Sequence, residues 1–307
     1  MSLQYFYSLE EALGALFGDG ADIAKTERIS GGDINEAYGL TLTDGSHVFM
    51  KANSRAEASF FEAEAAGIEA IARTGTVGTP QVLGYGVNAG RMGKSFLLLE
   101  FVAAKKRMPD YWEMLGHQLA DMHRADTAGC VQNGRFGFKG DNYIGMRRQI
   151  NTPHESWITF FRDCRLLPQL QAASRFFDAA DLRKITWLLD HLADFLTEPD
   201  CPSLLHGDLW AGNVMTGNDK RAWLIDPAVS VGHAEADIAM TELFGGFPAA
   251  FYGAYQEAGI LQPDYRQRRD LYNLYHLLNH LNMFGGGYLP SVKRIVGRYA
   301  PVSLFSQ

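Results

Sequence analysis

The hydrophobic pattern of the chain changes between residues 102 and 109, and this change constrains the fold more than any other feature. Before it, apolar residues form short strand-like segments, at 23–29, 36–43, 46–52, 80–86 and 95–102. Beyond it, apolar residues recur at the helical period, over about 110–125, 155–171, 178–196 and 264–284. The pattern predicts an α+β chain of two lobes: 1–102, built on a small antiparallel sheet, and 103–307, mainly helical.

Local signals refine this division. Asp44-Gly45 joins two of the strand-like segments, as a hairpin turn would. Ser54 and Glu57 form a capping-box pattern that predicts the start of one helix within the first lobe, and Ser8 with Glu11 predicts another, shorter helix. In the second lobe, "AWLID" at 222–226 is the only segment that reads as a strand.

Charge and cysteine content narrow the classes of function. The chain has 28 basic and 35 acidic residues, a formal charge of -7, which argues against broad nucleic-acid binding. Cys130, Cys164 and Cys201 are too few and too far apart for a disulfide framework, which favours a reducing cytoplasm. Glu10 and Glu11 interrupt the first apolar residues, so we expect no signal peptide, and no segment has the roughly 20 apolar residues of a membrane span.

The segment "LLHGDLWAGNVM" at 204–215 carries the clearest chemical signal. Asp208 and Asn213 are five residues apart, as are the aspartate and asparagine of the protein-kinase catalytic loop. Asp226 follows 18 residues after Asp208, at the end of a predicted strand, where kinases place a second metal-binding aspartate. Each feature alone is typical of a turn or a cap. Together they predict a kinase-like phosphotransferase that uses ATP and Mg²⁺.

Candidate phosphate-binding residues lie in the first lobe. "SGGDIN" at 30–35 could present backbone N–H groups to an anion, although such a sequence is more often only a turn. Lys51 ends the segment "HVFMK", where a surface lysine is the commoner interpretation. Glu62 and Glu64 follow on a predicted helix, and Glu64 flanks its apolar stripe, from which it could hold Lys51 toward a phosphate.

Two other patterns are rejected. "NAGRMGKS" at 88–95 has Asn88 where a phosphate-binding loop of the Walker type needs glycine, and it leads into a predicted strand rather than a helix. His276 and His280 are spaced like zinc ligands on a helix, but the glutamate of a metalloprotease motif and a third ligand are missing from the sequence.

With these motifs in hand, the chain resembles the fructosamine kinase, or ketosamine-3-kinase, family, whose members are relatives of aminoglycoside phosphotransferases within the protein-kinase-like fold. The resemblance spans nearly the whole chain. It is most specific where "HGDLWAGN" is combined with "GHAEADIAM" and "LYHLLNHLN".

The resemblance implies roles for particular residues. Asp208 would be the catalytic base, and Asn213 and Asp226 would bind Mg²⁺. ATP would be held by Gly31, Gly32, the Lys51–Glu64 pair and the hinge residues Glu100 and Val102. Trp210, His280 and Asn282 would contact the acceptor.

The implied reaction transfers the γ-phosphoryl group of ATP to the 3-hydroxyl of a ketosamine, which is a ribulosamine, erythrulosamine or fructosamine. The 3-phosphate is unstable and releases the amine, so the activity would be deglycation of small molecules or of glycated proteins. Some family members form a redox-sensitive disulfide dimer through a cysteine in the glycine-rich loop. Asp33 stands at that position here, so we expect a monomer without this switch.

Two rival functions remain open from the sequence. A small-molecule kinase of the aminoglycoside or choline type would share every catalytic residue but would need a different acceptor pocket. A non-catalytic nucleotide-binding pseudokinase would bind ATP without turnover.

Overall fold

The computed structural model describes residues 3–29, 35–88, 93–103 and 105–300. Its first part is a six-stranded sheet in the order β1-β5-β6-β4-β3-β2. The strands are β1 (Tyr5–Phe6), β2 (Ile23–Ile29), β3 (Glu36–Leu42), β4 (His47–Asn53), β5 (Val82–Val87) and β6 (Ser95–Glu100). All neighbours pair antiparallel except β1 and β5, which are parallel. Because residue 95 begins a strand, the Walker-like sequence before it does not open a helix.

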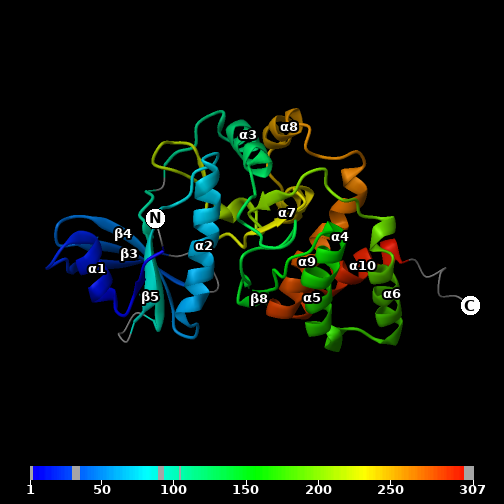
Figure 1. The fold of residues 1–307 in the computed structure, drawn as a ribbon, viewed down its shortest axis with the longest axis horizontal. Coiled ribbons are helices and arrows are strands. Elements are labelled where there is room, and N and C mark those ends of the chain that lie inside the picture. The colour runs from blue at the N-terminus through cyan, green and yellow to red at the C-terminus, as the bar shows by residue number, and fades with distance from the viewer. Residues whose placement is uncertain (1–2, 30–34, 89–92, 104, 301–307) are drawn as a thin grey trace, which may run out of the picture.

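Two helices cover opposite faces of this sheet. Helix α1 (Leu9–Phe17) packs with one set of buried strand residues and α2 (Ala58–Thr74) with another. The Ser8 hydroxyl accepts from the Glu11 N–H, as predicted. The capping box predicted at residues 54–57 is wrong, because α2 begins only at Ala58 and its N-cap, Glu57, makes no capping bond. The end of α2 reaches the core of the second part, and α2 lies between the two parts in Figure 1.

The second part is mainly helical and has the larger core. Its α-helices are α3 (Tyr111–Arg124), α4 (Trp157–Phe160), α5 (Leu167–Ala172), α6 (Ala179–Asp190), α7 (Glu235–Leu243), α8 (Ala249–Glu257), α9 (Tyr265–Phe284) and α10 (Leu289–Tyr299). A π-helical turn, Phe161–Leu166, joins α4 to α5 and makes the predicted helix at 155–171 continuous. The helix predicted to reach residue 196 ends at Asp190. No helix within the described residues is long and apolar enough to cross a membrane.

The strand predicted at 222–226 is confirmed as β11 (Ala222–Leu224), but the prediction that it is the only strand in this part is wrong. The structure has three small antiparallel pairs: β7 (Asn142–Ile144) with β8 (Arg147–Gln149), β9 (Ser203–Leu205) with β12 (Ser230–Gly232), and β10 (Val214–Thr216) with β11 (Ala222–Leu224). Three-residue strands are too short to show an alternation of polar and apolar residues, so the sequence pattern did not reveal the other five.

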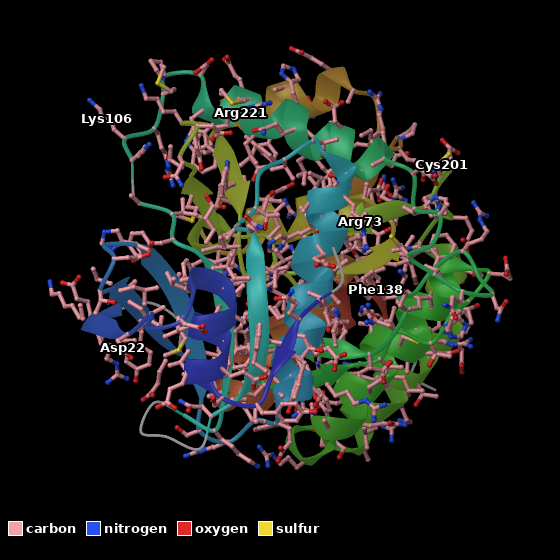
Figure 2. All side chains as sticks on the ribbon, turned by 60° about the vertical axis from the view of Figure 1, so that its left-hand side comes forward. Asp22, Arg73, Lys106, Phe138, Cys201 and Arg221 are labelled. Carbon is pink, nitrogen blue, oxygen red and sulfur yellow. The ribbon has the colours of Figure 1, made fainter. Side chains whose placement is uncertain are left out.

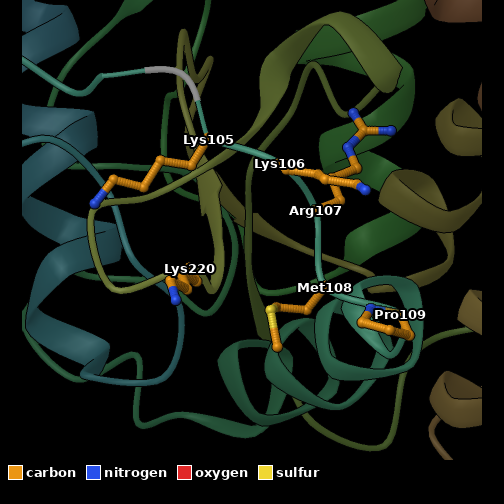
Figure 3. Close-up of a pocket in the computed structure, with 6 residues that line it drawn as sticks. All are labelled: Lys105, Lys106, Arg107, Met108, Pro109 and Lys220. Atoms are coloured by element: carbon orange, nitrogen blue, oxygen red, sulfur yellow. The ribbon is translucent and has the colours of Figure 1, made fainter.

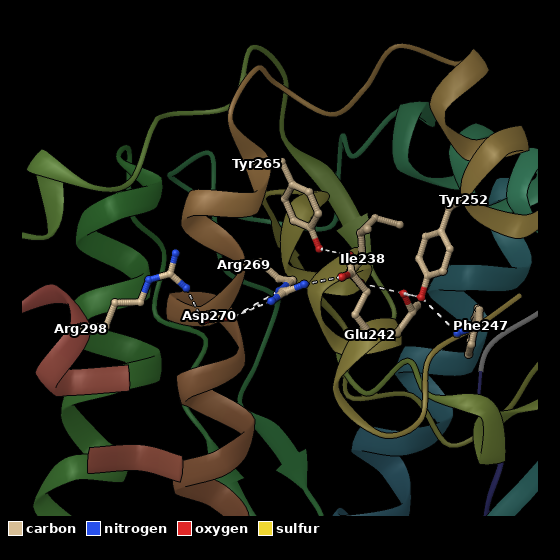
Figure 4. Close-up of polar contacts among 9 residues, drawn as sticks. Ile238, Glu242, Phe247, Tyr252, Tyr265, Arg269, Asp270 and Arg298 are labelled. Carbon is tan, nitrogen blue, oxygen red and sulfur yellow. Dashed lines mark hydrogen bonds and ion pairs between the residues drawn. The ribbon is translucent and has the colours of Figure 1, made fainter. Parts of the chain in front are cut away.

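Ion pairs fix the long helix α9 against its neighbours. Figure 4 shows Arg269 reaching Glu242 of α7 at 2.8 Å and Asp270 accepting from Arg298 of α10 at 2.7 Å. Deeper in the same interface, Arg268 holds Glu235 with two hydrogen bonds, of 2.8 and 2.6 Å. Glu235 is fully buried, so this pair is well shielded from water.

We predict that Arg268→Met strongly destabilises the fold, because it leaves the buried Glu235 carboxylate without its cation. The expected loss in the free energy of unfolding is about 3–5 kcal/mol, measured by urea denaturation. Arg266→Met is the matched control, since Arg266 is an exposed arginine on the same helix turn. Equal stability of the two variants would contradict the prediction.

Candidate active site

The predicted base and metal ligands lie on two adjacent loops. One loop joins β9 to β10 and carries Asp208 and Asn213, and the other joins β11 to β12 and carries Asp226. Since β9 pairs with β12 and β10 pairs with β11, the two loops emerge side by side from the same small sheets. Of the four strands that hold the site, the sequence pattern predicted β11 and missed β9, β10 and β12.

The two loops are also tied to each other directly. The Ala228 N–H donates to the His206 carbonyl at 2.8 Å, and His206 Nε2–H donates to the Ile225 carbonyl at 2.9 Å. Burial lowers the pKa of His206, which keeps the ring neutral. Gly207 has φ +81°, and a Cβ there would lie 2.1 Å from the Ala228 oxygen, so this close approach requires glycine.

A buried carboxylate from α7 anchors the turn before Asp208. Asp237 accepts the backbone N–H groups of His206 at 2.7 Å and of Gly207 at 2.9 Å. It also contacts His123 Nε2 at 3.2 Å, and His123 Nδ1 lies 2.7 Å from the Tyr255 hydroxyl. Although burial opposes it, the hydrogen bond from His123 holds the pKa of Asp237 below its usual value.

Sequence reasoning missed the anchoring roles of Asp237, His123 and Tyr255. The available signal was an aspartate between apolar residues in "EADIAM", on a segment too apolar for a surface acid. Such an acid needs buried donors, and here backbone amides supply them.

Asp208 and Asn213 are brought together within their loop. Asn213 Nδ2 donates to the Asp208 carbonyl at 2.8 Å and to its carboxylate Oδ2 at 3.2 Å. Burial raises the pKa of Asp208 to about 7, and the charges of Asp226 and Asp237 act in the same direction. A carboxyl group with this pKa can exchange a proton near neutral pH.

Lys51, on β4 of the sheet, binds both α2 and the loop between β11 and β12 that carries Asp226. Its ammonium lies 2.5 Å from Glu64 Oε1 and 2.6 Å from Asp226 Oδ1. Although burial opposes it, the carboxylates of Asp226 and Glu64 raise the pKa of Lys51, which therefore stays charged. Glu62, the weaker candidate for this pairing, does not contact Lys51; its charge instead adds to the burial that raises the pKa of Tyr85 to about 12.

The donor set of Asn213 and Asp226 fits Mg²⁺. Asp226 adopts φ +56°, a left-handed conformation, directly after β11. Its side chain is 42% exposed, and among the described residues only Lys51 contacts it. Asn213 uses its amide nitrogen for Asp208, which leaves its oxygen available. One carboxylate and one amide oxygen are hard ligands of the kind Mg²⁺ binds when phosphates and waters complete its shell.

Of the predicted nucleotide-binding residues, the structure describes Glu100 and Val102 of the hinge but not the glycines. Glu100 ends β6 and accepts from Gln81 and Asn218 through its side chain, each at 3.3 Å. Val102 follows the strand, and within the described part of the chain its backbone N–H and C=O have no partner, as adenine recognition would need. Gly31 and Gly32, together with Asp33, lie outside the described residues.

The predicted acceptor residues fall into separate environments. Trp210 follows Asp208 in the loop and is 41% exposed. His280 packs among aromatic rings, with centroid distances of 4.9 Å to Phe244 and 5.1 Å to Tyr288. Asn282 donates to Gln169 instead. None of the contacts among the described residues joins Trp210 to His280 or Asn282.

The histidines do not form a zinc site. Burial lowers the pKa of His276 to about 3, and His276 lines a small internal cavity beside Gly207 and Asp237. Across the described ranges, no group of three or more histidine, cysteine or acidic side chains could hold a metal ion.

One hollow lies away from the predicted catalytic residues. It has a volume of about 510 Å³ and lies along the segment that leads from the hinge into α3 (Figure 3). Its lining residues are Lys105, Lys106, Arg107, Met108, Pro109 and Lys220. Lys106 projects at the edge of the molecule in Figure 2, and residues 105–109 are exposed, so this basic cluster is a solvated surface.

Sequence comparisons agree with this geometry. A family model described as fructosamine kinase matches residues 6–301. A Synechocystis protein named a ketoamine kinase is 40% identical over 276 residues, which cover 89% of this chain and 90% of that protein. A rice protein named a chloroplastic protein-ribulosamine 3-kinase is 38% identical over 284 residues, 92% of this chain and 80% of that protein.

Solved structures give the same result for the fold. A Thermobifida fusca protein named a fructosamine-3-kinase superposes with a TM-score of 0.80 and 33% identity, covering 95% of this chain and 98% of that one. A Ralstonia eutropha protein named an aminoglycoside phosphotransferase has a TM-score of 0.59 and 17% identity, covering 94% and 97%. At 17% identity, the likeness to the Ralstonia protein concerns the fold alone. The predicted α+β, protein-kinase-like fold is confirmed.

We predict that Asp237→Asn loosens the turn at residues 206–207. A hydrogen bond to a charged group contributes about 1.5–3 kcal/mol, so exchange of the His206 and Gly207 amide hydrogens should accelerate at least about tenfold. Hydrogen exchange followed by mass spectrometry measures this change. Asp121→Asn is the control because Asp121 is an exposed acid on α3. Unchanged exchange at both amides would show that the carboxylate charge is not needed there.

Proposed function

The chain belongs to the fructosamine kinase family, and on this premise we propose that it transfers the γ-phosphoryl group of ATP to the 3-hydroxyl of a ketosamine. Loss of the amine from the resulting 3-phosphate would make it a deglycation enzyme. Residues 1–102 would bind the nucleotide, and residues 103–307 would carry the catalytic loop and the acceptor site.

The observation that carries this proposal is the convergence of five side chains from distant parts of the chain. Lys51 lies between Glu64 and Asp226, and Asp208 lies in hydrogen-bond contact with Asn213. This set combines a cation for phosphates, two oxygen ligands for a metal and a carboxylate base. Phosphoryl transfer needs these parts because its catalysis depends mainly on positioning and charge stabilisation.

Asp208 would act on the acceptor. The 3-hydroxyl oxygen forms a bond to the γ-phosphorus, the bond from that phosphorus to the bridging oxygen of ADP breaks, and the hydroxyl proton passes to the Asp208 carboxylate. Because the pKa of Asp208 is raised to about 7 by burial and by nearby carboxylates, it is a better proton acceptor than an exposed aspartate. Asn213 orients this carboxylate through its amide nitrogen.

Lys51 and the hinge would hold the nucleotide. The Lys51 ammonium stays charged and is fixed by Glu64, so it can contact phosphate oxygens without reorganising. Asn213 and Asp226 would hold Mg²⁺, which when bound neutralises phosphate charge. The backbone of Glu100 and Val102 would contact adenine, and the exposed ring of Trp210 would face the sugar part of the acceptor.

We predict that Asp208→Asn lowers kcat by about 10²- to 10⁴-fold while ATP binding is retained, because the change removes the base and keeps the shape of the side chain. The measurement is ADP release with Mg-ATP and a panel of lysine-derived ribulosamine, erythrulosamine and fructosamine, with choline and kanamycin as alternative acceptors. Calorimetry of ATP binding verifies that the nucleotide site survives.

The panel separates the rival functions. Selective turnover of a ketosamine by the wild-type enzyme supports the proposal and identifies the sugar. Turnover of only choline or kanamycin would replace the acceptor class, and ATP binding without turnover of any acceptor would favour a pseudokinase.

A further inference from the structure

The hairpin β7–β8 lies between the two parts of the molecule and next to the predicted active site. Figure 1 places β8 between α2 and the helices α5 and α9. Tyr143 of β7 packs on Phe60 of α2, with ring centroids 4.6 Å apart. Met146, in the turn, contacts Asn53 at the end of β4, with 3.9 Å between its sulfur and the amide nitrogen.

The other face of this hairpin is bound to the active-site loops. Gln149 donates to the Ala228 carbonyl at 3.0 Å and accepts from the Tyr275 hydroxyl at 2.7 Å. Asn142 donates to the Val229 carbonyl at 2.7 Å. Ala228 and Val229 follow the predicted metal ligand Asp226 in the chain, so the hairpin is held at a fixed position beside the catalytic residues.

The register assigns Arg147 to this inner face. Asn142 pairs with Gln149 and Ile144 pairs with Arg147, and side chains two residues apart on a strand share a face. Arg148 belongs to the opposite face together with Tyr143. It is exposed and binds Asp141 through Nε at 2.8 Å.

Tyr275 of α9 connects the inner face of the hairpin electrostatically with the predicted base. Burial raises the pKa of Tyr275 to about 12; the negative charge of Asp208 raises it further, and the positive charges of Arg165 and Arg147 lower it. Asp208 and Arg147 are thus both within electrostatic reach of the same phenol. Because Arg147 shares the inner face of the hairpin with Gln149, and Gln149 binds Tyr275 of α9, this face is turned toward the helix that carries the predicted acceptor residues His280 and Asn282.

Arg147 has no protein anion to bind. Its Nε is buried without a hydrogen-bond partner, and across the described ranges no carboxylate lies within ion-pair distance of it. A partly buried guanidinium without a partner is unfavourable, so a ligand that supplies an anion would be bound favourably there.

The chemistry of the acceptor decides which anion fits. The phosphates of ATP already have Lys51 as their cation, on the sheet side of the site. A ketosamine carries a protonated secondary amine, which Arg147 would repel if the acceptor brought no negative charge of its own. A sugar adduct of the α-amine of an amino acid has a carboxylate one carbon from that amine, so it supplies the anion.

Building on the proposed function, we propose that Arg147 binds the carboxylate of the acceptor and makes the enzyme selective for ketosamines formed on the α-amine of amino acids. Arg147 is then a specificity-determining residue. Ketosamines on lysine side chains or on simple amines would be poorer substrates because their amine lies far from any carboxylate.

The experiment compares two acceptors that differ in one charge, ribulosyl-glycine and ribulosyl-glycinamide. The wild-type enzyme should have a KM for the carboxylate that is at least about tenfold lower than for the carboxamide, as a charge-assisted hydrogen bond implies. Arg147→Gln should remove this preference with little change in kcat. Arg147→Lys, which keeps the charge, should retain part of it.

Arg148→Gln is the matched control, because it removes the same type of side chain from the same strand on the other face. It should keep the wild-type preference. Equal KM values for the two acceptors in the wild-type enzyme, or an equal loss of preference in Arg148→Gln, would overturn the proposal. A loss of kcat on both acceptors in Arg147→Gln would also overturn it, since Arg147 would then act on the transferred phosphoryl group. If the wild-type enzyme turns over neither acceptor nor any other ketosamine, the proposed function itself fails.

Discussion

The Lys51 ammonium is the interaction on which the arrangement of the site depends. It contacts Glu64 of α2 and Asp226 of the loop after β11, so one charge connects the sheet, the helix that packs on it and the catalytic part of the molecule. Each carboxylate alone would be costly next to the protein interior, and the lysine alone would be costlier still. The two carboxylates keep the Lys51 ammonium charged, although burial opposes its charge, at the place where a phosphate and a metal would bind.

A second layer of contacts anchors the loop that carries the proposed base. Asp237 holds two successive backbone amides before Asp208, and His123 and Tyr255 in turn fix Asp237. These bonds act on the backbone before Asp208, in addition to the hydrogen bond by which Asn213 orients its carboxylate. The proposed role of Arg147 follows the same principle, because a hairpin held by buried amides presents one charged side chain at a fixed place.

The family assignment and the site geometry constrain different parts of the functional conclusion. Membership of the fructosamine kinase family rests on similarity along nearly the entire chain. The roles of individual residues rest on their contacts, and the identity of the acceptor depends on charges around Asp208. For this reason the proposed role of Arg147, which the sequence motifs do not include, concerns the choice of acceptor. The proposed roles of Lys51 and Asp226 concern only phosphoryl transfer from ATP.

The sequence by itself determined the elements with long periodic patterns and the residues joined by short loops. Helix α9 and strands β2 to β4 follow from periodicity. Asp208 and Asn213 meet because they are five positions apart in one loop. Tertiary structure alone decided the contacts between segments that are distant in the chain. Lys51 and Asp226 are 175 residues apart, and Asp237, which anchors the loop before Asp208, lies on α7. Apart from β11, the strands of the three short pairs have too few residues for a readable pattern. Sequence patterns record local periodicity, whereas contacts between distant segments depend on how the whole chain packs.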